Sequence, residues 1–175
     1  MTVTIKIVSS KSDLKKFIYY PLELHKGHNN WVPPIFSEEF AFYNPFKNKS
    51  LVTNEHILAL AYENNRIIGR IMCIINKHYN EIYNLKDARF FAIECINDQQ
   101  VMHELIEFVK NWAISKGMTR MVGPYGFSDK DPQGFMIEGY EHIPLIATNF
   151  NFPYMVQLLE NEGFAKEVDC LSYKM

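Results

Sequence analysis

A short apolar strand that runs directly into an amphipathic helix, within residues 88–117, is the feature that most constrains the fold. Residues 90–96 are mostly apolar, as in a strand, and beyond Asp98 the apolar residues recur at helical spacing. This change of period places the junction near Asp98, a residue type that caps helices, while Lys116 and Gly117 suit the helix end. We therefore expect a cleft where the strand feeds into the helix.

The composition predicts one domain over residues 1–175. Of these residues 47% are hydrophobic and 14% aromatic, which is enough to bury a core. The formal net charge of −2 provides no basic stripe for phosphates, which argues against nucleic acid as a partner. No apolar run approaches the roughly 20 residues that span a bilayer, so we expect neither a signal peptide nor a membrane span.

The cysteines and histidines do not form a metal-binding pattern. Cys73, Cys95 and Cys170 lie in separate apolar runs, without the paired spacing of a zinc site or a disulfide framework. His25 and His28 are one helical turn apart, yet no further ligand lies nearby in the sequence. We therefore predict no metal site and a reduced, cytoplasmic setting.

The remaining segments alternate between strand and helix signals. Ser10 and Asp13 predict a capping box, and the helix that follows should stop near Pro21 because proline lacks the N–H of a helix interior. Residues 31–46, rich in proline and aromatic side chains, predict an ordered irregular segment over the core. The other predicted elements are an opening strand at 2–8, a hairpin of strands 56–62 and 66–75, a strand at 119–123, a loop from 124 to about 143, a helix at 154–162 and a last strand at 165–173.

The resulting order, β-α-β-β-β-α-β-α-β, resembles the GNAT superfamily of acyl-CoA-dependent N-acetyltransferases. Residues 69–71 (Gly-Arg-Ile) resemble the centre of that family's third strand, and residues 161–164 (Asn-Glu-Gly-Phe) resemble the end of its fourth helix. Residues 31–34, 90–94 and 123–124 together resemble an uncharacterised GNAT-like group. The resemblance implies an α+β (α/β layered) fold, with a mixed, mainly antiparallel central sheet of about six strands flanked by about three main helices.

The loop between the strand and the helix at residues 95–101 departs from the GNAT pattern. In that family a glycine-rich loop and the helix dipole hold the CoA pyrophosphate, whereas this loop contains neither glycine nor arginine. Asp98 would repel phosphates unless its side chain turns back to cap its own helix. The resemblance implies acetyl-CoA or another acyl-CoA as co-substrate. The residues that would bind it are Ile93, Cys95, Ile96, Asp98, Gln99, Gln100 and Val101.

Glu94 and Tyr154 are the candidate catalytic residues. The resemblance implies that Glu94 takes a proton from an amine, whereas the alternative is a carboxylate that faces solvent or pairs with Arg70 or Arg89. Tyr154 is a candidate to protonate a leaving thiolate or to line the pocket, with a structural role at the helix start as the alternative. The family's usual tyrosine is replaced here by Leu159.

Two functions from different classes remain open. The first is acyl transfer from an acyl-CoA to an unknown amine, a small molecule or a peptide. The second is a non-catalytic GNAT-like module that binds a small ligand, a peptide or a partner domain. A β-bulge in residues 93–100 that splays the strand, with free N–H groups at residues 98–101, would favour the first. An unpaired edge on the last strand would favour a homodimer or pairing with a further domain.

Overall fold

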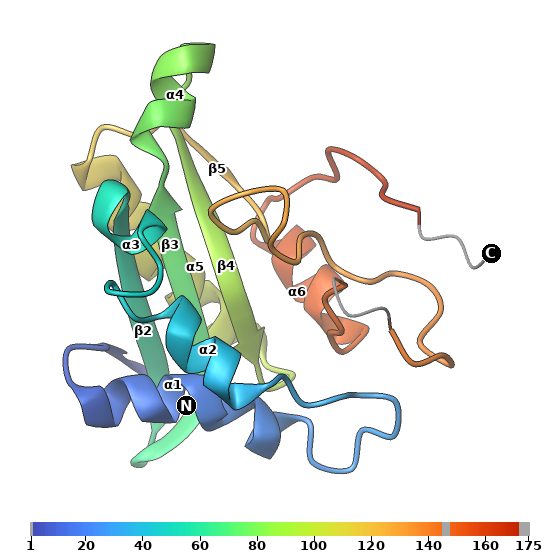
Figure 1. The fold of residues 1–175 in the computed structure, drawn as a ribbon. Coiled ribbons are helices and arrows are strands. Elements are labelled where there is room, and N and C mark those ends of the chain that lie inside the picture. Colours follow the sequence, from blue (N-terminus) through green and yellow to red (C-terminus); the bar gives the residue numbers. More distant parts are fainter. Residues whose placement is uncertain (1, 145–147, 172–175) are drawn as a thin grey trace.

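A twisted five-stranded sheet forms the centre of the protein in the computed structural model, which describes residues 2–144 and 148–171 (Figure 1). The strand order is the sequence order, with antiparallel pairing from β1 to β4 and parallel pairing between β4 and β5. The strands are β1 (Thr4–Ile7), β2 (Glu55–Glu63), β3 (Arg66–Ile75), β4 (Asp87–Cys95) and β5 (Arg120–Val122). The mixed, mainly antiparallel sheet of the predicted fold class is therefore confirmed.

Helices cover both faces of this sheet (Figure 1). One face carries α1 (Lys11–Leu24), α2 (Phe36–Phe42) and α3 (Ser50–Thr53); the opposite face carries α5 (Gln99–Ser115) and α6 (Tyr154–Asn161), and α4 (Lys77–Tyr83) joins β3 to β4. The strands alternate accordingly, because Ile71 and Cys73 belong to the α5-side core whereas Met72 and Ile74 belong to the α1-side core.

The hairpin and the main helix form as the sequence predicts. Asn64 and Asn65 both have positive φ, at 46° and 67°, which matches the turn that joins β2 to β3. The Asp98 carboxylate caps α5, and the Ser10 hydroxyl caps α1 by accepting from the Asp13 N–H at 3.1 Å. Residues 36–42, which were expected to be irregular, instead form α2, and α4 was not anticipated.

The first helix continues through Pro21, so the prediction that it stops there is wrong. A proline in a helix leaves the carbonyl four residues earlier without its N–H donor. That carbonyl belongs to Phe17, and it accepts a hydrogen bond from Arg70 Nη1 at 2.9 Å. Arg70 is buried on the adjacent strand β3, and its guanidinium replaces the donor that Pro21 lacks. The helix therefore reaches Leu24 and places His25 at its end.

The last predicted strand is not formed in its described part. Residues 165–171 contain no strand, and Val168, Cys170 and Leu171 are exposed, while Tyr173 lies outside the described residues. A strand needs a neighbour to satisfy its backbone, and the described residues 165–171 pair with none. The edge that was expected to recruit a second copy or a further domain is therefore absent from this stretch.

β4 is bulged and parts from β5. The bulge lies at Ala92 and Ile93, at the start of the 93–100 stretch in which a bulge would favour acyl transfer. Arg70 pairs with Glu94 and Met72 with Phe91, so Ala92 and Ile93 both stand opposite the single residue Ile71. Ala92, one of the two residues of the bulge, has a φ of 48°, so the extra residue distorts the backbone here. The paired residues of β5 reach only Arg89 of β4, although β4 continues to Cys95. The sheet is therefore open beside residues 92–95.

No helix in the described ranges is long and apolar enough to cross a membrane.

Gly69 lets helix α5 and strand β4 approach β3 closely, which gives a test of the packing. A Cβ added there would lie 2.9 Å from Leu105 Cδ1 and 3.0 Å from Cys95 Cβ. We expect Gly69→Val to lower the free energy of unfolding by about 1–3 kcal/mol through overpacking. Urea denaturation would measure the change, with exposed Val52→Ala as the control; equal midpoints for the two variants would contradict the packing argument.

Candidate functional site

An ion pair between Arg70 and Glu94 lies on the α1-side face of the sheet, next to the bulge. Arg70 donates from Nε and Nη2 to Glu94 Oε2, at 2.8 Å and 2.7 Å. Only 15% of the Glu94 side chain and 10% of the Arg70 side chain are exposed. The two residues are cross-strand partners, so the register of β3 and β4 sets their contact. Pairing with Arg70 was the alternative considered for Glu94.

His25 completes the pair from the end of α1. Its Nε2 lies 2.9 Å from Glu94 Oε1, and its Nδ1 lies 3.1 Å from His28 Nδ1. His25 is buried at 2% exposure, whereas His28 is partly exposed. Because a carboxylate only accepts, the contact with Glu94 requires the proton on His25 Nε2. The four side chains therefore form a continuous series from Arg70 to His28.

Aromatic rings hold the two histidines in place. The His25 ring is stacked between Trp31 and Phe152, at centroid distances of 4.7 Å and 4.8 Å. His28 also stacks on Phe152, at 4.3 Å, and Phe152 stacks in turn on Tyr154 at 5.2 Å. Trp31 precedes α2 and Phe152 precedes α6, so segments far apart in the sequence enclose the site.

The surroundings keep Glu94 ionised. Burial by itself raises the pKa of Glu94, but the Arg70 guanidinium and the hydrogen bond from His25 outweigh it and hold the pKa below its ordinary value. Burial and the neighbouring His25 both lower the pKa of His28. Glu39 of α2 also faces the cluster, and burial raises the pKa of its carboxyl although Arg70 opposes this.

Two tyrosines approach the end of β4. The Tyr154 hydroxyl donates to the Cys95 carbonyl at 2.9 Å, and burial raises the pKa of the phenol. The Tyr20 hydroxyl is buried and has no hydrogen-bond partner among residues 2–144 and 148–171. Burial raises the pKa of Tyr20 as well, with smaller effects of the same sign from Cys95 and Glu94. Both phenols are therefore neutral hydrogen-bond donors.

The N-terminus of α5 is occupied by the protein's own groups. The Asp98 carboxylate accepts from the N–H groups of Gln100 and Val101, at 2.8 Å and 3.4 Å. The Gln99 side chain donates to the Leu158 carbonyl at 3.0 Å and to the Glu162 carboxylate. The free N–H groups that would favour a CoA site are therefore missing at residues 100 and 101.

The other residues expected to bind the cofactor are mostly turned away from solvent. Ile93, Cys95 and Val101 are buried, and the Ile96 N–H donates to the Ile68 carbonyl at 3.0 Å. Only Gln100 of this set is exposed. A diphosphate does not fit this helix end, because the Asp98 carboxylate holds the N–H groups that would bind it and no basic side chain stands in the loop.

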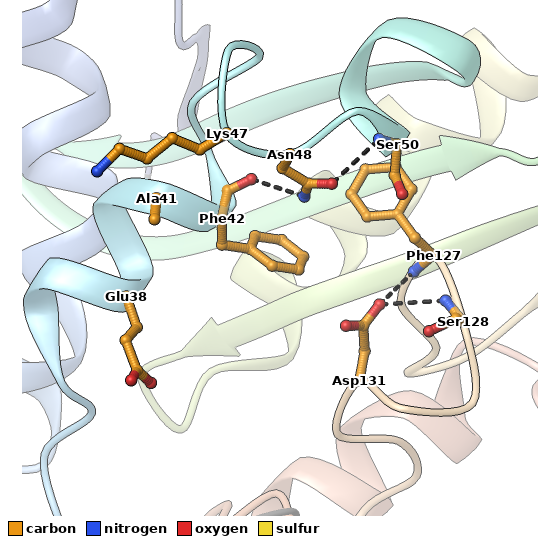
Figure 2. Close-up of a pocket in the computed structure, with 9 residues that line it drawn as sticks. All are labelled: Glu38, Ala41, Phe42, Lys47, Asn48, Ser50, Phe127, Ser128 and Asp131. Atoms are coloured by element: carbon orange, nitrogen blue, oxygen red, sulfur yellow. Dashed lines mark hydrogen bonds between the residues drawn. The ribbon is translucent and has the colours of Figure 1, made fainter.

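A hollow of about 370 Å³ lies on the α1-side face of the sheet (Figure 2). Phe42 and Phe127 give it an apolar wall, and Phe42 packs on Phe91 of β4 at a centroid distance of 5.7 Å. Glu38 and Asp131 place carboxylates at its edge, as Figure 2 shows. Neither Glu94 nor Tyr154 lines this hollow.

Sequence reasoning singled out Glu94 and Tyr154 as candidates but missed the histidines. The spacing of His25 and His28 suggested only a possible metal site. In the structure the two rings instead contact each other through a hydrogen bond. Glu94 lies 69 residues further along the chain, so no local pattern could connect it to His25. The polarity of Arg70 and Glu94 on opposed core strands was the available signal for a buried ionic site.

No protein-family model matches the chain. Among curated proteins, it is 28% identical over 174 residues to Protein YghO of Escherichia coli K12 and 28% identical over 168 residues to the Bacterial ceramide synthase of Caulobacter vibrioides. These matches cover 98% and 95% of the chain but 44% of each relative, so the chain spans less than half the length of the curated relatives it matches.

Solved structures show which fold this is. The chain superposes on an aminoglycoside acetyltransferase from a soil metagenome with a TM-score of 0.56 at 16% identity, covering 99% of this chain and 96% of the other. Glucosamine-6-phosphate N-acetyltransferase from Arabidopsis thaliana gives a TM-score of 0.56 at 13% identity, covering 99% of both chains. The chain has the GNAT fold.

A third GNAT structure was crystallised with acetyl-CoA. It is a predicted acetyltransferase from Clostridium acetobutylicum, with a TM-score of 0.57 at 10% identity and coverage of 99% of this chain and 96% of the other. At such identities the likeness concerns the fold. In this GNAT fold, the bulged strand β4 carries Glu94, which Arg70 of β3 and His25 at the end of α1 contact.

Removing the Glu94 charge tests how strongly the cluster supports the fold. We expect Glu94→Gln to lower the free energy of unfolding by about 3–5 kcal/mol, because it leaves the buried Arg70 without its anion. Glu107→Gln removes one partner of a largely exposed pair with Lys110 and should cost less than about 1 kcal/mol. Similar losses in chemical denaturation for both variants would contradict the buried-pair assignment.

The lowered pKa of Glu94 also predicts a pH dependence. The unfolded state takes up the Glu94 proton first as the pH falls, so the stability from this group is complete above about pH 5 and is lost as the pH falls through the folded-state pKa. Denaturation curves between pH 7 and pH 3 should therefore show a smaller acid loss for Glu94→Gln than for the wild type. Parallel stability profiles would contradict the pKa direction.

Proposed function

We propose that this chain is the acyl-transfer unit of an N-acyltransferase, which moves an acyl group from a thioester to an amine. The carrying observation is the Arg70–Glu94–His25–His28 series at the end of β4, beside the opening that the bulge and the short β5 leave in a GNAT fold. A buried, oriented set of titratable groups at such an opening suits proton transfer.

The chemistry requires a group that removes a proton from nitrogen. An aliphatic amine has a pKa near that of lysine, about 10.4, and is cationic at neutral pH. Glu94 is held as an anion by Arg70, so it does not keep a proton at neutral pH. In the proposal the Glu94 anion stabilises positive charge on the histidines, and His25 links Glu94 to the partly exposed His28.

Tyr154 is the proposed proton donor to the leaving sulfur. Its phenol is neutral and stands at the carbonyl of Cys95, at the open end of β4. Donation to a thiolate would replace the present hydrogen bond to that carbonyl. Removing the hydroxyl should therefore slow release of the thiol more than it weakens binding of the amine.

The relatives' names fit this reaction class. A ceramide is an N-acylated long-chain amine, and the Bacterial ceramide synthase is similar to nearly the whole of this chain. The structural neighbours named for an aminoglycoside and for glucosamine-6-phosphate also act on amines. For this chain we propose a small-molecule amine as acceptor, with the hollow beside Phe42 and Phe127 as an apolar surface for it. Glu38 and Asp131 carry carboxylates at the rim of this hollow, and Lys47 also lines it.

The acyl donor is tested first as acetyl-CoA or a longer acyl-CoA. The backbone of β4 that β5 leaves unpaired at residues 92–95 supports a thioester there, whereas the occupied α5 end opposes the diphosphate of CoA. If acyl-CoA is the donor, the wild type should bind it with a dissociation constant above about 100 µM.

The decisive experiment is a transfer assay with purified protein, a panel of acyl-CoAs and a panel of amines that includes long-chain amines. Formation of the amide, measured by mass spectrometry, should occur in the wild type and fall by about 100-fold or more in Glu94→Gln. Glu107→Gln, on α5 at the opposite face of the sheet, is the charge-matched control and should retain full activity. Amide formation that is equal in all three proteins would contradict a role for the Glu94 cluster.

Asp98 offers a separate prediction about the donor. Asp98→Ser keeps a helix-capping hydroxyl but removes the carboxylate, so we expect it to bind acetyl-CoA about tenfold more tightly than the wild type. Calorimetric titration with acetyl-CoA and with CoA would measure this, with Asp129→Ser as the control at a remote exposed site. Unchanged affinity in Asp98→Ser would rule out the α5 end as the diphosphate site.

A binding module without catalysis is the second candidate. It is favoured by the same Asp98 cap, and by Leu159, which is buried in the core where the GNAT pattern has its usual tyrosine. In that case neither the wild type nor Asp98→Ser would bind acyl-CoA or form an amide. The amine or peptide ligand would still stabilise the fold in a thermal-shift assay.

A further inference from the structure

We propose that His28 is the group through which this site accepts the proton of the attacking amine, with His25 and Glu94 aligned behind it. The inference rests on the proposed function and adds the residue that performs its proton transfer. The order of the hydrogen bonds in the series fixes which nitrogen can take up a proton.

The buried end of the series fixes its first hydrogen bond, and with a neutral His25 ring the second follows. Glu94 can only accept, so His25 donates from Nε2 across the 2.9 Å contact. In the neutral ring, His25 Nδ1 is then an acceptor, and the 3.1 Å contact makes His28 Nδ1 the donor. Nε2 of His28 is left with a free lone pair. The series therefore ends in a base.

Exposure decides that His28 rather than His25 meets the substrate. His25 is 2% exposed, lies between the Trp31 and Phe152 rings, and uses both nitrogens within the protein. His28 is partly exposed and rests on Phe150 and Phe152, which carry no charge. His25 is the titratable group that faces His28, and through it Glu94 and Arg70.

The charge of Glu94 reaches His28 through this series. When His28 Nε2 takes a proton, the new positive charge is stabilised by the bond from His28 to His25 and by the bond from His25 to the Glu94 anion. The lowered pKa of His28 leaves it neutral at pH 7 and able to accept. Burial and the neighbouring His25 lower the pKa of His28, and in the proposal Glu94 stabilises its protonated form.

The step balances without a further reactant. The amine nitrogen forms a bond to the acyl carbon and loses one proton to His28 Nε2. The carbon–sulfur bond breaks, and its electron pair leaves on sulfur. The sulfur takes up one proton from Tyr154, which regains one from solvent, and His28 returns its own to solvent. Starting from the neutral amine, the products are an amide and a thiol with no net change in protons; an ammonium acceptor first releases one proton to solvent.

The first test is independent of activity. Nuclear magnetic resonance of the ¹⁵N-labelled histidine rings in the wild type should show His25 protonated at Nε2 and His28 at Nδ1 at pH 7.5, with His28 titrating below pH 6.5. In Glu94→Gln the pKa of His28 should fall further, by about one unit. The opposite tautomers, or a His28 titration unmoved by Glu94→Gln, would overturn the series.

His25→Gln keeps the test open if Glu94→Gln fails to fold. The glutamine amide can donate to Glu94 but cannot transmit a proton as imidazole does, so the same fall in the pKa of His28 is expected. An unchanged His28 titration in this variant would overturn the coupling.

The second test uses the transfer reaction. The kcat/KM of the wild type should rise with pH through the His28 pKa and then level off. His28→Gln should lower kcat by about 100-fold with KM changed less than about threefold, and should remove that acid limb. His78→Gln, at an exposed histidine of α4, should behave as the wild type.

The outcomes separate the two proposals. If no amide forms with any donor while the ring titrations are coupled, the proposed function fails and the hydrogen-bonded series stands as a structural feature. If His28→Gln transfers at the wild-type rate with the same pH profile, the assignment of His28 fails and the transferase proposal stands.

Discussion

The buried guanidinium of Arg70 is the interaction on which this end of the structure depends. It donates to the Phe17 carbonyl that Pro21 leaves without a partner, binds Glu94 across the strands, and lies over the Phe17 ring at 5.1 Å. A buried cation needs such partners because its desolvation costs several kcal/mol. One side chain thus joins α1, β3 and β4, and the same contacts set the position of His25 and the charge of Glu94.

The region around β4 combines an open side and a closed side. The bulge at Ala92 and the short β5 leave the sheet unpaired beside residues 92–95. At the next turn of the chain, Asp98 closes the helix end by accepting the N–H groups that an anion would need. The end of β4 is therefore unpaired on the side of β5, while the adjoining helix end is filled by a carboxylate of the protein itself.

Local patterns were informative where one segment decides its own structure. The change of period near Asp98 identified the end of β4, the start of α5 and the capping residue, because all three depend on neighbouring residues. Local rules were wrong at Pro21, where a side chain from β3 replaces the missing donor, and at residues 165–171, where an apolar alternating run has no strand to pair with. In the first case a distant partner outweighed the local preference, and in the second the local preference was not enough because no partner strand is present among the described residues.

The sequence by itself determined the GNAT-like order of elements, the strand that carries Glu94, the placement of Tyr154 at the start of α6, and the departure of the α5 loop from a diphosphate site. Only the tertiary structure decided that Glu94 is shared between Arg70 and His25, and that His28 continues the series toward solvent. The composition and the hydrophobic period of a segment predict which face of its helix or strand a residue occupies. The contact of His25 with a residue 69 positions away depends on how α1 crosses β4, and no local spacing encodes that crossing.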